Sequence, residues 1–496
     1  MSSIEKTLID LGLTPSKAFD GKVSGLCIDS RAAKEGCLFA ALPGTQIHGA
    51  RFLAQALERG AKAVLTDQEG FQIAHQLSLQ DGACYVIVQD PHAALAAACA
   101  LWFEKQPSTM VAVTGTNGKT SVSSFCRQIW TELGLDAVNL GTTGVEGAFS
   151  APLAHTTPDP ITLHKLLYNC ASAGVTHGAM EASSHGLAQR RLDGVRLKAA
   201  GFTNFTQDHL DYHTSFEAYF DAKAGLFNRV LPPTGVAVIN IDDPKLAPFA
   251  ERLRKEGQKT ITVGRSVDAD LRLLAQKYDP AGQTIRFSYD GKTHQSFLPL
   301  IGGFQGENVL MAAALCIATG QEAHGVFEVL RELKTVRGRM EHAATRANGA
   351  TVFVDYAHTP DAVETAINAY RPHVMGRLIA IIGAGGDRDP TKRPLMGAAA
   401  AQSADYVVVT DDNPRSEDPK HIRNMVLEGT RDQDHVIEIG DRAEAILRAI
   451  DMLETGDGLL ITGKGHETGQ IIGDDVLPFN DVEQASVAVA ALDGVL

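Results

Sequence analysis

A glycine-containing loop with the sequence Thr114-Gly115-Thr116-Asn117-Gly118-Lys119-Thr120 stands between a run of β-branched residues and an amphipathic helical pattern. The backbone N–H groups of such a loop, together with the N-terminus of the following helix, can hold a polyphosphate. Lys119 would then reach the β- and γ-phosphates, and the Thr120 hydroxyl would bind Mg²⁺. The general pattern GxxxxGK[ST] has glycine where this chain has Val113, so an ordinary glycine turn is the alternative. We predict a nucleoside triphosphate site at this loop.

Other side chains have types suited to metal binding. Glu181 stands between a short apolar run and a Ser-Ser-His-Gly turn, where a carboxylate could hold a cation. His209 and His213 are four residues apart and would share one face of a helix, which suggests zinc, but no third nitrogen or sulfur ligand has a suitable spacing. Lys223 lies in a helical pattern, and its residue type alone predicts a solvated lysine.

The elements that must position these side chains predict an α/β fold in three domains, since 496 residues correspond to about three domains of ordinary size. Residues 1–107 hold short apolar runs broken by turns and predict a small α/β domain. Residues 108–335 contain the central P-loop-type nucleotide-binding domain. In residues 336–496, strand-like runs end in Gly- or Asp-rich loops and alternate with helices. This pattern predicts a Rossmann-like, mostly parallel domain with a ligand site at the carboxyl ends of its strands.

Composition narrows the class of partner. Hydrophobic residues make up 44% and charged residues 21%, so each domain can bury a core. The net charge of −14 disfavours nucleic acid and anionic membranes as partners. The seven cysteines are odd in number and scattered, which indicates reduced thiols. The longest apolar run, at 93–103, is too short to span a bilayer, and we expect a cytoplasmic monomer that does not insert into membranes.

A series of short motifs gives the chain a recognisable order: GTNGKT, MEASSHGL, NFTQDHLDYH, AYFDAK, NIDD, GENVLMAAA, GRME, DYAHTPDA and GAGGDRD. Together they resemble the Mur ligases, and the resemblance covers nearly the whole chain. The first domain matches more loosely, through DSR at 29–31 and TQIHG at 45–49. Three segments resemble the Mur ligases that add 2,6-diaminopimelate: SSHGLAQRRL at 183–192, GDRDPTKRP at 386–394 and DNPR at 412–415.

The resemblance implies a set of residues for ATP, Mg²⁺ and catalysis. Lys223 matches the family lysine that reacts with CO₂ to form a carbamate, which reverses the expectation from its residue type. Thr120 and Glu181 would hold one Mg²⁺, and His209 and the Lys223 carbamate the second. The expected catalytic residues are Lys119, Glu181, His209 and Lys223. The expected ATP contacts are Gly115, Thr116, Asn117, Gly118, Lys119, Thr120, Ser121, Asn308, Arg339 and Asp355.

The resemblance also implies three groups of substrate contacts. The uridine nucleotide would lie on the first domain, at Ile28, Ser30, Thr45, Gln46 and Ile47. The muramoyl peptide would meet His155, Thr156, Thr157, Ser183, Gln189 and Arg191. The amino acid would meet Arg388, Asp412, Asn413, Pro414, Arg415, Gly463 and Glu467, with Arg415 on its distal carboxylate. Arg337 and Ala384 depart from the residues usual in the family, and neither departure removes a charged or metal-binding group.

The expected activity is that of an ATP-dependent acid–amino-acid ligase of peptidoglycan biosynthesis. It would join meso-diaminopimelate to the D-glutamyl γ-carboxylate of UDP-N-acetylmuramoyl-L-alanyl-D-glutamate through an acyl phosphate. Three related ligases are alternatives: the lysine-adding enzyme, the D-alanyl-D-alanine-adding enzyme and folylpolyglutamate synthase. The DNPR sequence disfavours all three. A nucleotide-dependent regulatory switch and a simple phosphotransferase are alternatives from other classes.

Overall fold

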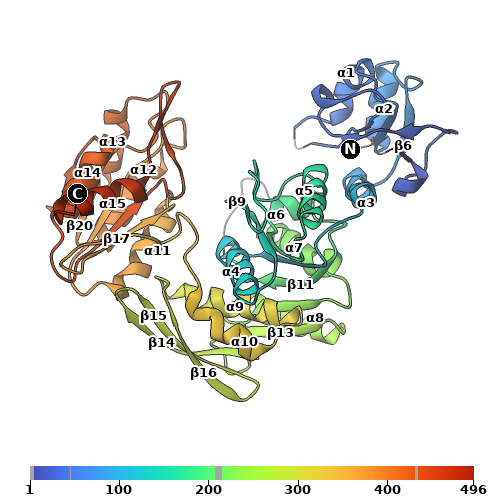
Figure 1. Cartoon of the computed structure of the whole chain (residues 1–496). Coiled ribbons are helices and arrows are strands. Elements are labelled where there is room, and N and C mark those ends of the chain that lie inside the picture. The colour runs from blue at the N-terminus through green and yellow to red at the C-terminus, as the bar shows by residue number, and fades with distance from the viewer. Residues whose placement is uncertain (1–4, 45, 207–214, 431–433, 496) are drawn as a thin grey trace. The chain divides into compact units, whose positions relative to one another are not determined.

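Three β-sheets of four or more strands organise the chain in the computed structural model, which describes residues 5–44, 46–206, 215–430 and 434–495 (Figure 1). The chain forms two compact units. Unit 1 contains residues 1–262 and 311–322, and unit 2 contains residues 263–310 and 323–496.

A parallel four-stranded sheet forms the N-terminal part of unit 1, in the order β3 (Leu26–Cys27), β4 (Leu38–Ala40), β5 (Ala63–Thr66) and β6 (Cys84–Ile87). Alternate residues of β4 face opposite sides: Leu38 packs in the cluster with α3 (Pro91–Phe103), and Phe39 packs in the cluster with α1 (Leu53–Glu58) and α2 (Gln68–Gln76). A short antiparallel pair, β1 (Lys6–Thr7) and β2 (Lys22–Val23), precedes the sheet. The predicted small α/β domain is present.

The second sheet of unit 1 carries the predicted nucleotide loop. Six of the ten strands of this sheet run in the order β12 (Val236–Asn240), β11 (Leu197–Phe202), β7 (Thr109–Thr114), β10 (His177–Glu181), β8 (Ala137–Gly141) and β9 (Gly144–Gly147). All neighbours are parallel except β8 and β9. β7, β8, β10 and β12 are buried along their whole length, as a parallel sheet covered on both faces requires. The carboxyl ends of β7, β10 and β11 therefore lie side by side.

Helices connect these strands. They are α4 (Lys119–Glu132), α5 (Pro160–Ser172), α6 (Ser184–Ala188), α7 (Phe216–Gly225) and α8 (Leu246–Lys255), with a π-helical turn at Leu226–Val230. Gly118 begins α4 in a left-handed conformation, with a φ of 86°. On one side of the sheet, Phe202 of β11 stacks on Phe227 at 5.7 Å between ring centroids. The helix predicted around Lys223 is confirmed as α7.

Unit 2 begins with the end of β13 (Lys259–Gly264) and the antiparallel strands β14 (Leu271–Asp279), β15 (Gly282–Tyr289) and β16 (Lys292–Leu298). Helix α9 (Phe304–Ala318) has its first residues in unit 2 and its last residues in unit 1, and α10 (Ala323–Glu328) follows. The antiparallel strands were not predicted from the sequence.

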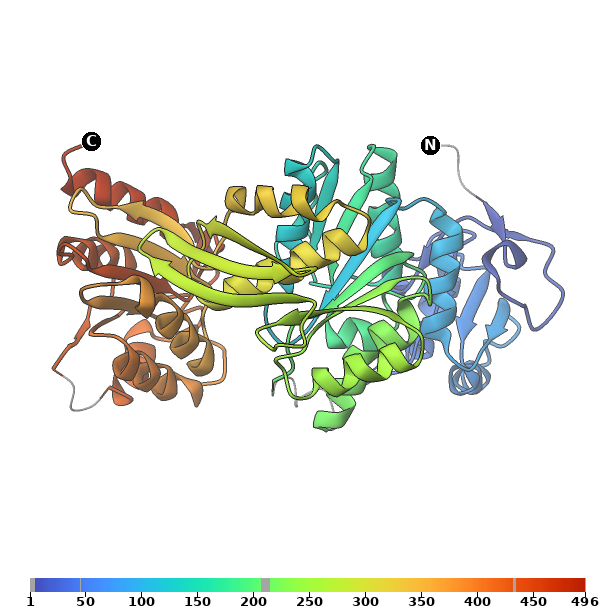
Figure 2. The same cartoon turned by 90° about the horizontal axis from the view of Figure 1, so that it is seen from below.

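The last sheet has the order β17 (Glu341–Thr345), β18 (Thr351–Asp355), β22 (Gly458–Thr462), β19 (Leu378–Ile382), β20 (Tyr406–Val409) and β21 (Val436–Glu438). Only the β17–β18 pair among its ladders is antiparallel. In Figure 2, the orange helices and the red helices lie on opposite sides of this sheet. The first group is α11 (Pro360–Tyr370), α12 (Lys392–Ser403) and α13 (Pro419–Glu428), and the second is α14 (Arg442–Asp451) and α15 (Asp481–Leu492).

This last domain is doubly wound, as the sequence predicted. Leu378, Ala380 and Ile382 of β19 pack with the first group of helices, while Ile379 and Ile381 pack with the second. The loops after β18, β19, β20 and β22 therefore emerge at one edge. A hairpin, β23 (Gly469–Ile472) and β24 (Asp475–Pro478), follows β22.

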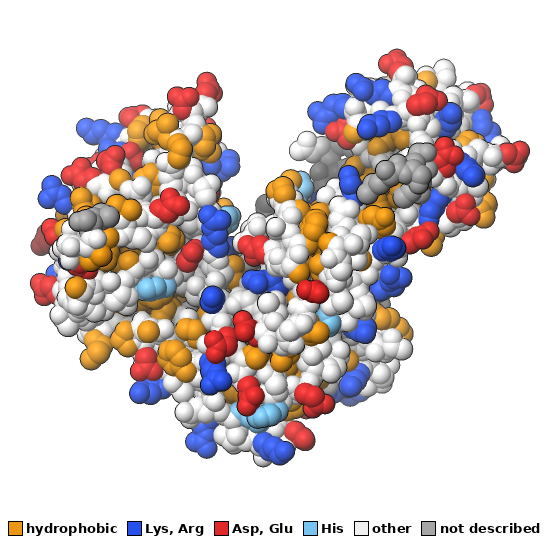
Figure 3. Space-filling model, in the orientation of Figure 1, with side chains coloured by type: hydrophobic (Ala, Val, Ile, Leu, Met, Phe, Trp, Pro, Cys, Tyr) orange, Lys and Arg blue, Asp and Glu red, His pale blue; other side chains and the backbone are white. Residues whose placement is uncertain are grey.

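Acidic and basic side chains are interspersed on the face shown in Figure 3. All seven cysteines are buried thiols. Among the described residues, no helix combines the length and the apolar character needed to cross a membrane.

Candidate active site

The nucleotide loop after β7 depends on two glycines. Gly115 has a φ of 146°, and a Cβ on it would lie 1.9 Å from Thr203 Oγ1. Gly118 has a φ of 86° and begins α4. Since left-handed backbone favours glycine and the first position has no room for a methyl group, the loop keeps its backbone open at the helix N-terminus.

Residues after β11 hold this loop in place. Thr203 Oγ1 donates to Asn117 O (2.6 Å), and Asn117 N donates to Asn204 Oδ1 (2.9 Å). Thr116 N donates to Asn204 O (3.0 Å). The sequence analysis gave Thr203 and Asn204 no role. The signal that could have found them is their place directly after a strand that pairs with β7.

The side chain of Lys119 folds back to the carbonyl groups of the nucleotide loop. Its Nζ donates to Gly115 O (3.0 Å) and Thr116 O (2.8 Å). The ammonium therefore lies beside the backbone that would hold a polyphosphate. Thr120 and Ser121 follow in the first turn of α4, where Ser121 is buried. The structure thus brings together the predicted phosphate contacts 115–121.

Glu181 ends β10 and is buried, with 1% of its surface exposed. Its Oε1 accepts a hydrogen bond from Thr142 N (2.8 Å), and its Oε2 accepts one from Thr142 Oγ1 (3.4 Å). A Cβ on Gly141 would lie 2.0 Å from Oε1, so the glycine leaves the carboxylate its space. Thr142, at the end of β8, is a further residue that the sequence analysis missed.

Lys223 corrects the expectation drawn from its residue type, because it is buried with 1% of its surface exposed. Its Nζ donates to Gly115 O (2.7 Å) and lies 4.6 Å from the centre of the Tyr219 ring. α7 places this lysine against the nucleotide loop, so the solvated-lysine expectation is wrong. The carbamate that the family resemblance implied for Lys223 stays a prediction.

Two predicted residues, His209 and Thr45, lie outside the described residues, as does His213. Within the described part of the chain, no group of three or more His, Cys, Asp and Glu side chains could hold a metal ion. The zinc alternative and the second Mg²⁺ position therefore stay predictions.

The predicted muramoyl-peptide residues converge around Arg191. Its Nη1 donates to Thr157 O (2.6 Å), and its Nη2 donates to Gln189 Oε1 (2.7 Å). Ser183 N donates to Thr157 Oγ1 (3.1 Å). Thr157 Oγ1 in turn donates to the backbone carbonyl oxygen of Glu181 (3.0 Å), which links this group to the end of β10.

The remaining residues of this predicted group are at the surface or near it. Thr156 Oγ1 lies 3.2 Å from Thr142 Oγ1, while His155 is exposed.

In the N-terminal domain, Ser30 Oγ donates to Gln55 Oε1 (2.6 Å) and is largely buried. Ile28, Gln46 and Ile47 are exposed. Exposed apolar side chains beside polar groups suit a nucleotide base.

Two of the predicted ATP contacts, Arg339 and Asp355, lie in unit 2. Asp355 Oδ2 accepts from Met340 N (2.8 Å), and Asp355 Oδ1 accepts from Ala357 N (2.9 Å). Burial raises the pKa of Asp355, and the positive charge of Arg339 opposes that rise. Asn308 lies in α9, where its Nδ2 donates to Gln305 Oε1 (3.2 Å).

The predicted amino-acid residues meet at the carboxyl edge of the last sheet. Asn413 Nδ2 donates to Glu467 Oε2 (2.8 Å), and Arg415 Nη1 donates to Gly386 O (2.7 Å). A Cβ on Gly463 would lie 2.4 Å from Asp412 Oδ2, which explains the glycine there.

Two other members of this group differ in exposure. Pro414 is buried, while Arg388 is exposed and its Nη1 donates to Asp387 O (3.2 Å). A buried arginine that the sequence analysis missed, Arg393, makes a paired contact with Glu417 at 2.8 Å to each oxygen. Asp387 N also donates to Glu417 Oε1 (2.6 Å), so the GDRD and DNPR loops are tied to each other.

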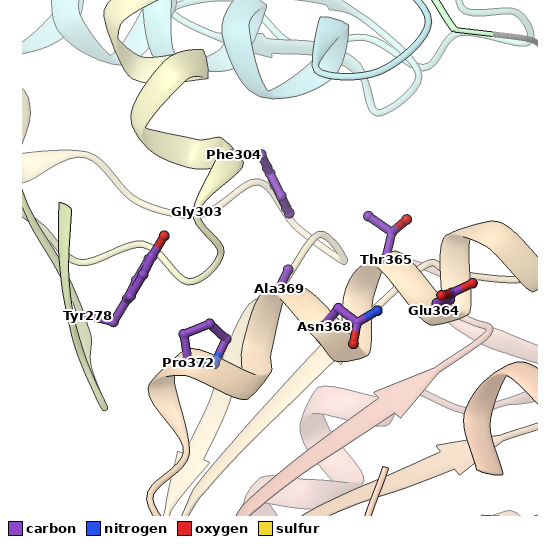
Figure 4. A pocket seen from close by; sticks show the side chains of 8 residues that line it. All are labelled: Tyr278, Gly303, Phe304, Glu364, Thr365, Asn368, Ala369 and Pro372. Atoms are coloured by element: carbon purple, nitrogen blue, oxygen red, sulfur yellow. The ribbon is translucent and has the colours of Figure 1, made fainter. Parts of the chain in front are cut away.

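A separate pocket of about 420 Å³ lies in unit 2, beside α11 (Figure 4). It is lined by Tyr278, Gly303, Phe304, Glu364, Thr365, Asn368, Ala369 and Pro372. None of the predicted site residues is among them.

Comparisons with known proteins identify the family of the chain. The Mur ligase family catalytic domain matches residues 22–102, the Mur ligase middle domain matches 113–316, and the Mur ligase glutamate ligase domain matches 338–465. The UDP-N-acetylmuramoyl-L-alanyl-D-glutamate–2,6-diaminopimelate ligase of Caulobacter vibrioides is 46% identical, covering 98% of this chain and 99% of the relative. The enzyme of the same name from Bradyrhizobium diazoefficiens is also 46% identical, covering 95% of each chain.

A solved structure of a UDP-N-acetylmuramoyl-L-alanyl-D-glutamate–2,6-diaminopimelate ligase is 32% identical, with a TM-score of 0.75 and coverage of 99% of both chains. The α/β architecture has the N-terminal, central and C-terminal domains that the three family models describe. Because those models and relatives cover nearly the whole length, the chain belongs to the Mur ligase family.

Proposed function

We propose that this chain is the Mur ligase that joins diaminopimelate to the γ-carboxylate of D-glutamate in UDP-N-acetylmuramoyl-L-alanyl-D-glutamate, at the expense of ATP. The observation that carries the proposal is the 46% identity, over nearly the full length, to the Caulobacter vibrioides ligase that is named for this reaction. The Asp412–Arg415 loop at the carboxyl edge of the last sheet supports the same substrate, because it offers an arginine for a carboxylate.

ATP is needed because a carboxylate is a poor acceptor for an amine. The γ-carboxylate takes the γ-phosphoryl group of ATP and becomes an acyl phosphate, which has phosphate as a good leaving group. Lys119, beside the loop backbone, is placed to neutralise the charge on the transferring phosphoryl group. The amine of the amino acid then attacks the acyl carbon, phosphate leaves, and an amide remains.

Magnesium would supply positive charge between the phosphates and the carboxylate. Thr120 and Glu181 offer hydroxyl and carboxylate oxygens, which are the ligands that Mg²⁺ prefers. The space kept for the Glu181 carboxylate by Gly141 supports this role. Thr142 orients the carboxylate through its N–H and hydroxyl.

Lys223 is proposed to carry a carbamate that binds the second Mg²⁺ with His209. Carbamate formation requires a neutral amine, and it converts a buried cation into an anionic oxygen ligand. The burial of Lys223 against the nucleotide loop supports a role at the phosphates rather than in solvent.

The three substrates are assigned to different domains. The uridine nucleotide lies at residues 28–30 and 45–47, and the muramoyl peptide reaches Arg191 and its neighbours. The amino acid lies among Arg388, Arg415 and Glu467, with Asn308, Arg339 and Asp355 on ATP. Because ATP and UDP-linked precursors are small soluble molecules, we place the enzyme in the cytoplasm. We also propose that it is a monomer.

Phosphate release from ATP tests this function. The purified chain is incubated with ATP, Mg²⁺ and the UDP-muramoyl dipeptide, and diaminopimelate, lysine or D-alanyl-D-alanine is added in parallel. The proposal predicts rapid release only when the dipeptide and diaminopimelate are both present. Release without the amino acid would indicate an ATPase or a switch, and a preference for lysine or D-alanyl-D-alanine would overturn the substrate assignment.

A further inference from the structure

Lys464 is a fully buried cation in the turn after β22, with 0% of its side chain exposed. Its Nζ donates to Asn413 Oδ1 (2.7 Å) and to Gly469 O (2.9 Å). The same nitrogen lies 3.6 Å from Asp412 Oδ1 and 3.9 Å from Glu467 Oε2. A buried ammonium is costly unless hydrogen bonds and opposite charges surround it, and here both are present.

The first group that Lys464 fixes is the amide of Asn413. Asn413 Oδ1 accepts from Lys464 Nζ and also from Ile471 N (2.9 Å). The amide nitrogen therefore faces the other way and donates to Glu467 Oε2 (2.8 Å). Asn413 is 4% exposed, so its amide serves mainly to orient Glu467 from within the protein.

The second group is the β23–β24 hairpin, which pairs with the backbone of Arg415. Arg415 N donates to Ile471 O (3.0 Å), and Gly473 N donates to Arg415 O (2.7 Å). Arg415 has a φ of 52°, a conformation that costs energy for any residue except glycine and needs support from its surroundings. Lys464 Nζ donates to Gly469 O, in the first residue of this hairpin. The lysine therefore contacts both the hairpin that pairs with Arg415 and the Asn413 amide that donates to Glu467.

Burial has the largest effect on Lys464 and lowers its pKa, and the carboxylates of Asp412 and Glu467 partly offset that effect. The guanidinium of Arg442 opposes them, but it is paired with Asp481 in a fully buried contact at 2.7 Å. The lysine is thus the cation that faces the two carboxylates of the amino-acid loops.

We propose that Lys464 is a positioning residue for the amino-acid site, because its ammonium holds Asn413 and the hairpin so that Glu467 and Arg415 keep a fixed spacing. A carboxylate from Glu467 and a guanidinium from Arg415 suit a substrate with an ammonium and a carboxylate on one distal carbon. The proposal rests on the proposed function insofar as Glu467 and Arg415 bind the amino acid. Lys464 itself does not touch the substrate.

The test compares Lys464→Met, which keeps the length of the side chain and removes the charge, with the wild type and with Lys420→Met. Lys420 lies exposed on α13 in the same domain and is the matched control. Full-length proteins are assayed for the KM of the amino acid, ATP and the UDP-muramoyl dipeptide, and their Tm values are measured. The amino acid used is whichever of diaminopimelate, lysine and D-alanyl-D-alanine the wild type accepts best. A wrong substrate assignment is therefore seen in the wild type alone and leaves the Lys464 test intact.

The KM for the amino acid is expected to rise at least about 30-fold in Lys464→Met, since breaking a buried charge pair has large effects. The KM values for ATP and the dipeptide should stay within about twofold, and Lys420→Met should match the wild type. In an Asn413→Leu background, Lys464→Met should add no more than about threefold, because the two residues act as one unit.

Two results would overturn the proposal. One is a folded Lys464→Met variant whose KM for the amino acid lies within about threefold of the wild type. The other is a parallel rise of all three KM values with a fall in Tm, which indicates a structural role alone. If Lys464→Met does not fold, Lys464→Gln keeps an N–H donor without the charge, and the same criteria apply to it.

Discussion

Lys119 and Lys223 donate to one acceptor, the carbonyl oxygen of Gly115, at 3.0 Å and 2.7 Å. Two lysines that come from different helices thus meet at the backbone of the nucleotide loop. Lys119 stands at the end of the loop in the sequence. Lys223 lies 108 residues after Gly115. Their expected roles differ, since one is a cation for phosphate and the other a precursor of an anionic metal ligand.

Replacing Lys119 tests the first role. Lys119→Ala should reduce kcat by roughly a thousandfold or more, because a cation that stabilises the transferring phosphoryl group is lost. Initial rates of phosphate release at saturating substrates measure the effect. Lys165→Ala, on the exposed side of α5 in the same unit, should behave as the wild type. Near-normal turnover of Lys119→Ala would remove this lysine from the mechanism.

Replacing Lys223 tests the second role, and chemical rescue separates it from the first. Lys223→Ala should be almost inactive, and short carboxylic acids added in excess should restore part of the activity by supplying an anionic oxygen in the vacated space. Lys119→Ala should show no such rescue, because it lacks a cation. The carbamate assignment fails if Lys223→Ala is fully active without a carboxylic acid.

Arg415 is expected to choose the amino acid. Arg415→Ala should lower kcat/KM for diaminopimelate, and the corresponding activation free energy should rise by about 2 to 5 kcal/mol, the scale for losing a buried charge pair. The kcat/KM for lysine should fall much less or rise. The two amino acids are compared in the phosphate-release assay, with the exposed Arg448→Ala as control. Equal losses for both amino acids would show that Arg415 supports the loop without selecting the substrate.

Glu417 should make a pH-dependent contribution to stability. Hydrogen bonds from Arg393, and then from Asp387 N, lower the pKa of Glu417 to about 2 from its ordinary value of 4.5. A lowered carboxyl pKa stabilises the folded state above the unfolded pKa, and this stabilisation is lost as the pH falls toward the folded value.

Glu417→Gln should therefore lower the free energy of unfolding by about 1 to 3 kcal/mol at pH 7, since it leaves Arg393 buried without its charge partner. Thermal unfolding between pH 7 and pH 4 measures this. The difference from wild type should stay constant down to about pH 5 and narrow below about pH 4.5. Glu454→Gln, 80% exposed, should change little at any pH. A difference that does not depend on pH would contradict the carboxylate's role.

Much of the fold follows from local sequence. The buried strands β7, β10, β18, β19, β20 and β22 are short apolar runs that end in Gly- or Asp-rich loops, and such runs predict parallel strands with a site at one edge. The nucleotide loop could be located for the same reason, because Gly115 and Gly118 stand between a strand and a helix.

The contacts between distant segments could not be predicted from residue types. The residue type of Lys223 predicts a solvated side chain, and the packing of α7 against the loop buries it. Thr142 and Asn204 become part of the site because β8 and β11 lie next to the site strands, an order that the sequence does not state. Asn413 was expected on the substrate, but its amide is engaged by Lys464, Ile471 and Glu467.

The fate of a carboxylate oxygen tests the proposed reaction most directly. UDP-N-acetylmuramoyl-L-alanyl-D-glutamate labelled with ¹⁸O in both γ-carboxylate oxygens is ligated with ATP and diaminopimelate, and the released phosphate is analysed by mass spectrometry. Ligation through an acyl phosphate predicts one ¹⁸O in every phosphate released, because the oxygen that took the phosphoryl group leaves with it. Amide formation with unlabelled phosphate, or phosphate release without amide formation, would contradict the account.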